Sequence, residues 1–194
     1  MSKKDIKRKV IRISLLGDSG VGKLDIIKKY LFDKFSETNN SSIGIEKNEK
    51  RVKMNDGNEL KVIIWDTAGQ ERFKAMSTNT IKGAQGIVLV FDNNKKETFE
   101  SLTSWIQQVK EVKDNIPIVL FGNKPDLIEK PEVEKDEAEK FAKDNDMEYF
   151  EISDKQNINI ENGFKCIIDK AYETAQEEDG LALKKTQKKK KSRC

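Results

Sequence analysis

Two continuous apolar runs constrain the fold of this 194-residue chain more than any other feature. They are GIVLVF at Gly86–Phe91 and IPIVLF at Ile116–Phe121, and neither alternates apolar with polar residues. Such runs are typical of strands that are buried on both faces of a parallel sheet. The segment between them has helical spacing, with apolar residues at Phe99, Leu102, Ile106 and Val109. The sequence therefore predicts an α/β domain with a mostly parallel sheet.

The rest of the chain continues the alternation of strand and helix patterns, which predicts a three-layer domain. The polar turn Asn55–Asn58 indicates a hairpin between two of the strands. The apolar pattern stops at about Gln176, so we expect a basic extension at 1–9, a domain at 10–176 and a flexible polybasic tail at 177–194. Further strands are expected at Val10–Leu16, Arg51–Met54, Leu60–Trp65 and Glu148–Ile152, and further helices at 22–33, 134–143 and 160–175.

Composition excludes several kinds of chemistry. The chain has no histidine, which excludes histidine general acid/base catalysis, histidine-paired nucleophiles and histidine-ligated metals. Its two cysteines, Cys166 and Cys194, are too few for a disulfide framework and favour a reducing compartment. Cys166 is expected to pack at the edge of the core. No secretory leader or apolar run long enough to span a membrane is found, which predicts a cytosolic or peripheral protein.

A glycine-rich segment, GDSGVGK at Gly17–Lys23, follows the first strand and opens the first helix. This matches the G-x-x-x-x-G-K pattern in the context it requires. Glycines allow backbone N–H groups to surround a phosphate, the helix N-terminus favours negative charge, and the lysine adds a positive charge. The residues expected to bind phosphate are Asp18, Ser19, Gly20, Val21, Gly22 and Lys23.

One residue departs from the pattern within the same nucleotide site. A serine or threonine, whose hydroxyl ligates Mg²⁺, is expected after the lysine, and this chain has Leu24. Leucine has no oxygen and cannot ligate a hard cation. Binding of Mg²⁺ is therefore expected to depend on phosphate oxygens, water and other groups.

Three more motifs follow predicted strands in order. WDTAGQE ends the third strand, where Asp66 can hold Mg²⁺ through water, Gly69 can offer its N–H to a γ-phosphate and Gln70 can orient an attacking water. NKPD supplies Asn123, Lys124 and Asp126, and a carboxylate there can accept hydrogen bonds from guanine N1 and its 2-amino group. After the last strand, backbone N–H groups could meet guanine O6, and the residues there are Ser153, Asp154 and Lys155.

Together, GDSGVGK, WDTAGQER, GNKPD and EISDK resemble the motifs of the Ras superfamily of small GTPases, and WDTAGQERF is most similar to the Rab branch. The resemblance covers roughly residues 8–176. It implies a P-loop NTPase fold with a six-stranded, mostly parallel sheet and about five flanking helices. It also implies a GDP/GTP switch that acts in vesicle and membrane traffic.

The resemblance implies roles for further residues and partners. Phe35 takes the place of the aromatic residue that packs on guanine, and Ser42 that of the threonine that ligates Mg²⁺ and senses the γ-phosphate. Gln70 matches the residue that positions water, and Lys23 assists it at the phosphates. The implied partners are an exchange factor, an activating protein, an extraction chaperone and effectors. Lys47, Thr80 and Ile81 replace aromatic residues that are usual in Rab effector surfaces, and of that surface only Trp65 remains.

The C-terminal tail carries a different charge from the domain. Seven basic residues, six lysines and Arg193, lie between Lys184 and the terminal Cys194. The other 30 basic and 34 acidic residues leave the preceding chain at −4, although the whole chain is at +3. A lipid on Cys194 together with a polybasic run would make a two-signal membrane anchor, and geranylgeranylation is the expected modification. The C-a-a-X pattern is absent, so an unmodified thiol is the alternative. No nucleic-acid partner is expected.

The sequence leaves two hypotheses for function. The first is a switch that binds GTP with Mg²⁺, hydrolyses it slowly and acts on the cytosolic face of an intracellular membrane. The second is a guanine nucleotide-binding scaffold with impaired switching, which Leu24 favours because the triphosphate state depends most on the metal. An ATPase or kinase is disfavoured by Asn123, Lys124 and Asp126.

Overall fold

Six strands form one sheet in the computed structural model, which describes residues 9–32, 48–65, 74–124, 131–153 and 155–191. Their order across the sheet is β2-β3-β1-β4-β5-β6. Only β2 runs antiparallel to its neighbour, and all other pairs are parallel. This confirms the predicted six-stranded, mostly parallel sheet. The strands are β1 (Lys9–Leu16), β2 (Glu49–Lys53), β3 (Glu59–Trp65), β4 (Gly86–Asp92), β5 (Ile118–Asn123) and β6 (Glu148–Glu151).

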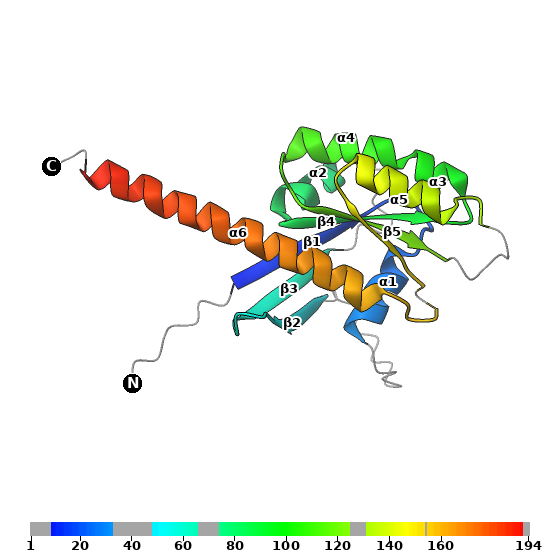
Figure 1. The fold of residues 1–194 in the computed structure, drawn as a ribbon, viewed down its shortest axis with the longest axis horizontal. Coiled ribbons are helices and arrows are strands. Elements are labelled where there is room, and N and C mark those ends of the chain that lie inside the picture. Colours follow the sequence, from blue (N-terminus) through cyan, green and yellow to red (C-terminus); the bar gives the residue numbers. More distant parts are fainter. Residues whose placement is uncertain (1–8, 33–47, 66–73, 125–130, 154, 192–194) are drawn as a thin grey trace.

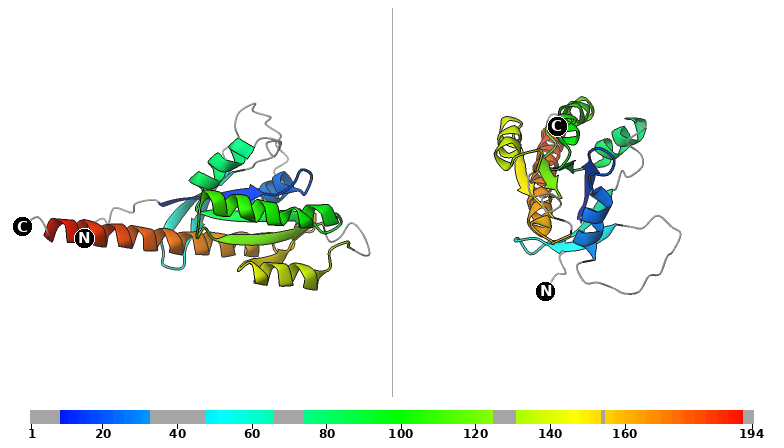
Figure 2. Two further views of the ribbon diagram at one scale, coloured as in Figure 1. Left: turned by 90° about the horizontal axis from the view of Figure 1, so that it is seen from above. Right: turned by 90° about the vertical axis from the view of Figure 1, so that its right-hand side faces the viewer.

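Helices cover both faces of the sheet (Figures 1 and 2). One apolar cluster joins one face to α1 and α6, and a second joins the other face to α2, α3, α4 and α5. The three-layer prediction is thus confirmed. The helices are α1 (Lys23–Leu31), α2 (Lys74–Gly83), α3 (Lys96–Glu100), α4 (Leu102–Val112), α5 (Lys135–Asp144) and α6 (Ile160–Lys191).

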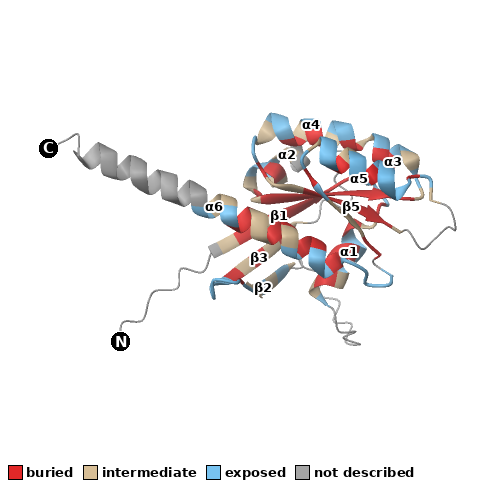
Figure 3. Ribbon diagram, in the orientation of Figure 1, coloured by how far each residue is buried: buried red, intermediate tan, exposed pale blue. Residues whose placement is uncertain are grey.

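The central strand β4 is buried along its whole length, as its apolar run predicts (Figure 3). Its alternate residues face the two clusters, so that Val88 and Val90 pack toward α1 and α6 while Leu89 and Phe91 pack toward the other helices. Apolar burial on both faces stabilises the strand by about 25 cal/mol for each Å² removed from water. The sheet interior is therefore closed to ligands, and polar chemistry is confined to its edges.

Several elements differ from the sequence prediction. Helix α2 was not predicted, because KAMSTNTIKG lacks a clear apolar period and contains weak helix formers. The expected helix between β4 and β5 is divided at Ser101 into α3 and α4. Strand β5 begins at Ile118 rather than Ile116, because Pro117 has no N–H with which to join a ladder.

The last helix is longer than predicted. Its apolar face ends where expected, with Phe164, Ile167, Ile168 and Ala171 buried against the sheet and Cys166 half-buried beside them. The expected end at residue 175 is wrong, because α6 continues to Lys191 and extends beyond the sheet (Figure 1). Residues 177–191 therefore belong to this helix, and the flexibility of the tail stays a prediction. Six of these fifteen residues are lysine, and two leucines, two glutamates and one alanine add further residues that favour helix without tertiary packing.

The close approach of β1 and β4 requires a glycine at residue 17. Gly17 has φ of 141°, and a Cβ built there would lie 2.1 Å from the main-chain oxygen of Val90 in β4. Gly57, in the β2–β3 hairpin, also has a positive φ of 82°, but a Cβ there would meet nothing within 4 Å. A side chain at residue 17 would therefore meet both steric overlap and backbone strain, whereas a side chain at residue 57 would meet backbone strain alone.

We predict that Gly17→Ala lowers the free energy of unfolding by about 3–5 kcal/mol, because overlap with the backbone of β4 adds to backbone strain. The matched control Gly57→Ala should cost about 1–2 kcal/mol, from strain alone. Urea denaturation of both variants measures this difference. Equal losses would contradict the tight contact between Gly17 and Val90.

Candidate functional site

The carboxyl ends of β1, β4 and β5 lie side by side at one edge of the sheet. In parallel sheets, loops beyond the carboxyl ends of the strands form the usual ligand crevice. The glycine-rich loop follows β1, and the NKPD motif begins at the last residue of β5. Two motifs separated by about a hundred residues of sequence thus meet at one edge.

The loop between β1 and α1 has a backbone that only its glycines adopt easily. Gly20 and Gly22 have positive φ values of 79° and 95°, and Gly22 caps the N-terminus of α1. Lys23 is only 4% exposed, and its Nζ donates hydrogen bonds to the main-chain oxygens of Gly17 and Asp18, each at 2.7 Å. The loop therefore surrounds a buried ammonium at a helix N-terminus, which is a favourable place for an anion.

Asn123 joins the end of β5 to this loop. Its side chain is fully buried, and its Nδ2 donates to the main-chain oxygen of Val21 at 2.9 Å. Because β4 lies between β1 and β5, this bond crosses the end of the central strand. Among the described residues, the Oδ1 of Asn123 has no hydrogen-bond partner. A buried acceptor without a partner is costly and is an expected contact for a ligand.

Lys124 makes a second connection between the same two motifs. Its Nζ donates to the main-chain oxygen of Gly20 at 2.6 Å and forms an ion pair with Asp92 at 2.9 Å. Asp92 is only 2% exposed, and its side chain also accepts from the main-chain N–H of Asn94 at 3.0 Å. Lys124 itself has a positive φ of 64°, a conformation that non-glycine residues hold mainly where their surroundings impose it.

Asp18 turns its carboxylate out of the loop toward the α3–α4 junction. Its Oδ2 accepts from the hydroxyl of Ser101 at 2.7 Å, and its Oδ1 accepts from the indole Nε1 of Trp105 at 2.9 Å. Sequence reasoning missed Ser101, Trp105 and Asp92. No local pattern signals the first two, which lie 83 and 87 residues after their partner.

Leu24 occupies the first turn of α1 and is 39% exposed. It is therefore not a core leucine, and an apolar side chain stands in solvent where the motif requires a metal-ligating hydroxyl. Within the described residues, no group of three or more histidine, cysteine, aspartate or glutamate side chains could hold a metal ion. The described part of the loop therefore does not fit a direct Mg²⁺ ligand at residue 24.

The remaining predicted site residues are divided between described and undescribed parts of the chain. Ser153 is fully buried, and its hydroxyl accepts from the main-chain N–H of Gln156 at 3.0 Å, whereas Lys155 is exposed. Ser19 is exposed at the tip of the loop. The sites that fall outside the described residues are Phe35, Ser42, Asp66, Gly69, Gln70, Asp126, Asp154 and Cys194, together with Lys47.

The structure changes the interpretation of the aromatic replacements. Ile81 is fully buried in the core between α2 and the sheet, so it does not contribute to an exposed surface. Thr80 is half-buried. Trp65 lies beneath the guanidinium of Arg12, 5.9 Å from its ring centroid, and a Cβ at Gly83 would meet its ring at 2.6 Å. A glycine at residue 83 is therefore what allows α2 to approach Trp65.

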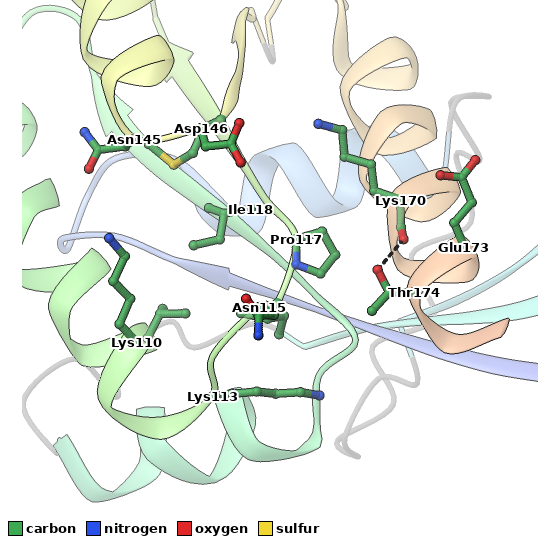
Figure 4. A pocket seen from close by; sticks show the side chains of 13 residues that line it. Lys110, Lys113, Asn115, Pro117, Ile118, Asn145, Asp146, Lys170, Glu173 and Thr174 are labelled. Atoms are coloured by element: carbon green, nitrogen blue, oxygen red, sulfur yellow. Dashed lines mark hydrogen bonds between the residues drawn. The ribbon is translucent and has the colours of Figure 1, made fainter. Parts of the chain in front are cut away.

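A cavity of about 500 Å³ lies at the beginning of β5, the opposite end of this strand from Asn123 (Figure 4). Its lining mixes lysines with the carboxylates of Asp146 and Glu173. Lys113 donates to the main-chain oxygen of Ala84 at 2.7 Å, and Lys170 is 3.6 Å from the carboxylate of Glu148. The size of this cavity therefore does not identify it as the functional site, since its charges are mixed and partly paired.

Burial perturbs several titratable groups outside the site, among them Cys166 and Tyr149. Burial raises the pKa of the Cys166 thiol, a direction that favours its protonated form. Burial also raises the pKa of the Tyr149 hydroxyl above its usual range. Both groups pack against the core, and neither lies in the loop around Lys23.

The described part of the chain contains no helix that is long and apolar enough to cross a membrane.

Comparisons with known proteins agree with the geometry of this edge. The sequence model of the Ras family matches residues 12–173. Rab-13 from Bos taurus is 37% identical over 159 residues, which cover 81% of this chain and 78% of that protein. Rab-8A from Mus musculus is 38% identical over 156 residues, which cover 80% of this chain and 75% of that protein. The chain therefore belongs to the Ras family and is a Rab-like small GTPase.

Proposed function

We propose that GTP binds at the carboxyl ends of β1, β4 and β5, and that this chain hydrolyses it slowly. The observation that carries the proposal is the pair of bonds from Asn123 to Val21 and from Lys124 to Gly20, at 2.9 and 2.6 Å. They tie the phosphate loop to the motif that distinguishes guanine. One nucleotide can then contact both motifs, with its phosphates at the N-terminus of α1 and its base beyond the end of β5.

Each predicted residue has a role in this proposal. Lys23 and the N–H groups of the loop would bind the phosphates. Phosphate oxygens would then accept the hydrogen bonds that Lys23 now donates to main-chain oxygens of the loop. Asp126 would recognise guanine through its N1 and 2-amino groups, and Phe35 would pack on the base. The main chain at Ser153–Lys155 would face the guanine O6. Gln70 would align the attacking water, and Gly69 and Ser42 would close on the γ-phosphate.

The first test concerns the choice of base. The unmodified protein should bind GTP and GDP far more tightly than ATP, because adenine lacks the pair of donors that a carboxylate can recognise. We predict that Asp126→Ala weakens GTP binding by at least tenfold, the usual size of a lost hydrogen bond to a charged group, and removes the preference for guanine. Displacement of a fluorescent guanine nucleotide measures both effects, and equal affinity for GTP and ATP in the unmodified protein would contradict the proposal.

Mg²⁺, where bound, would neutralise charge on the β- and γ-phosphates, and the candidates to hold it are Ser42 and Asp66. The exposed Leu24 offers no oxygen. This observation favours the second candidate function, a guanine nucleotide-binding scaffold whose triphosphate state is weakened. The two candidates differ in whether the unmodified chain hydrolyses GTP when Mg²⁺ is supplied.

We predict that Leu24→Ser tightens Mg²⁺-dependent GTP binding by about tenfold, because it restores a hydroxyl where the motif places a metal ligand. Phe32→Ser is a matched control, since it removes another exposed apolar side chain just beyond the other end of α1. Affinity and single-turnover hydrolysis are measured with Mg²⁺ and with EDTA. Unchanged metal dependence in Leu24→Ser would contradict the role assigned to residue 24. Measurable hydrolysis by the unmodified chain would favour the switch over the scaffold.

The tail supports a second part of the proposal, association with the cytosolic face of an intracellular membrane. The α6 helix carries the lysines at 184–191 away from the sheet (Figure 1). Basic residues near an anionic surface contribute roughly 1 kcal/mol each, which suffices for stable anchoring only beside a lipid. The partners in this proposal are an exchange factor, an activating protein, effectors and a chaperone that extracts the lipidated form.

We predict a mass increment of the size of one geranylgeranyl group on Cys194 in protein purified from its native cells. The Cys194→Ser variant should lose both the increment and binding to vesicles that contain anionic lipid. Cys166→Ser is the matched control, since its half-buried thiol packs against the core and should not affect vesicle binding. An unmodified C-terminus in native protein would contradict the anchor.

A further inference from the structure

The phosphate loop contains a carboxylate that does not face the loop interior. Asp18 follows Gly17 directly, and its main-chain oxygen accepts a hydrogen bond from Lys23 Nζ at 2.7 Å. Its side chain turns the other way, to the hydroxyl of Ser101 at 2.7 Å and the indole Nε1 of Trp105 at 2.9 Å. The residue is thus fixed on both sides, through its main chain to the buried lysine and through its side chain to the helices.

The position of this carboxylate has an electrostatic consequence. Like charges within a few ångströms repel, and the repulsion increases where the surroundings exclude water. Asp18 lies in the loop that the proposal assigns to the phosphates, so its carboxylate would repel them more strongly if it were released from these two donors. The two donors occupy both carboxylate oxygens and direct them toward α4. Both donors are neutral, so they hold the carboxylate without adding a positive charge that competes for phosphate.

The donors are themselves held firmly. Ser101 joins α3 to α4, and its main-chain N–H donates to the oxygen of Glu97 at 3.1 Å. Trp105 lies one turn further along α4 and packs against the second apolar cluster. Helices α3 and α4 therefore present two donors to one loop side chain. The single hydroxyl proton of Ser101 has a second acceptor in the main-chain oxygen of Thr98 at 3.0 Å, but the carboxylate oxygen of Asp18 is nearer, at 2.7 Å. Donors that are already in place need no rearrangement when they bind a charge.

We propose that Ser101 and Trp105 are positioning residues for nucleotide binding, which keep the Asp18 carboxylate directed away from the phosphates. This inference rests on the proposed function of the loop. It assigns a task to the α3–α4 junction, which carries none of the nucleotide-binding motifs. It also explains how an acidic residue is compatible with an anion site.

The Asp18→Asn variant distinguishes this inference from a purely structural role of Trp105. If Trp105→Phe weakens binding only because packing is lost, then the loss is the same whichever residue stands at 18. If it weakens binding because a carboxylate is released, Asp18→Asn removes the charge, and most of the loss disappears. A double-mutant cycle between the two residues separates these outcomes.

We predict that Trp105→Phe weakens GTP binding on the order of tenfold, since a hydrogen bond to a charged group is lost. In the Asp18→Asn background, the same substitution should change affinity less than threefold. Ser101→Ala should follow the same pattern with a smaller loss, and Ser104→Ala, an exposed serine of the same helix, is the matched control. Affinities for GTP and GDP are measured by titration, with urea denaturation of each variant to monitor folding.

The outcomes distinguish this inference from the proposed function. If the unmodified protein binds no guanine nucleotide, the proposed function fails. If the unmodified protein binds GTP and Trp105→Phe is equally harmful with Asp or Asn at residue 18, the positioning role is wrong and Trp105 contributes packing only. If Trp105→Phe has no effect on affinity while it remains folded, the inference is also overturned.

Discussion

The buried bond from Asn123 to Val21 is the constraint on which the rest of the site depends. It passes across the end of β4, a strand that is buried along its whole length. Removing the Asn123 amide would leave the Val21 carbonyl without this partner beside the phosphate loop, at a cost of about 1–3 kcal/mol. Lys124, with its ion pair to the buried Asp92, adds a second connection at the surface of the same edge.

Much of this arrangement follows from the sequence. Apolar runs without alternation predicted the central strands, and the motifs that each follow a strand predicted a nucleotide site. The structure places two of these motifs at one edge, because parallel strands have their carboxyl ends together. The parts that escaped prediction depend on tertiary contacts or on helix propensity. Helix α2 has no clear apolar period, and α6 continues beyond its apolar face because its residues favour helix without packing. The contacts of Asp18 with Ser101 and Trp105 have no local signature at all.

Two replacements that resemble each other in the sequence have different physical meanings. Leu24 is exposed, so its lack of an oxygen bears directly on metal binding in the site. Ile81 is fully buried, so it fills the core between α2 and the sheet where its side chain stabilises the fold. The difference in burial thus shows that the replacement at residue 24 affects the metal site, whereas the replacement at residue 81 affects core packing. The sequence pattern alone treats both as substitutions in expected motifs.

The helical continuation of α6 changes what a C-terminal lipid would do. A flexible linker of similar length would let the domain sample many distances and orientations. A continuous helix rises about 1.5 Å for each residue, so the segment from 177 to 191 sets a stand-off of roughly 20 Å between the sheet and its end. If the helix and the domain move as one body, a tilt of the helix at the bilayer would rotate the nucleotide site by the same angle. The surface offered to partners would then depend on how the helix lies on the membrane.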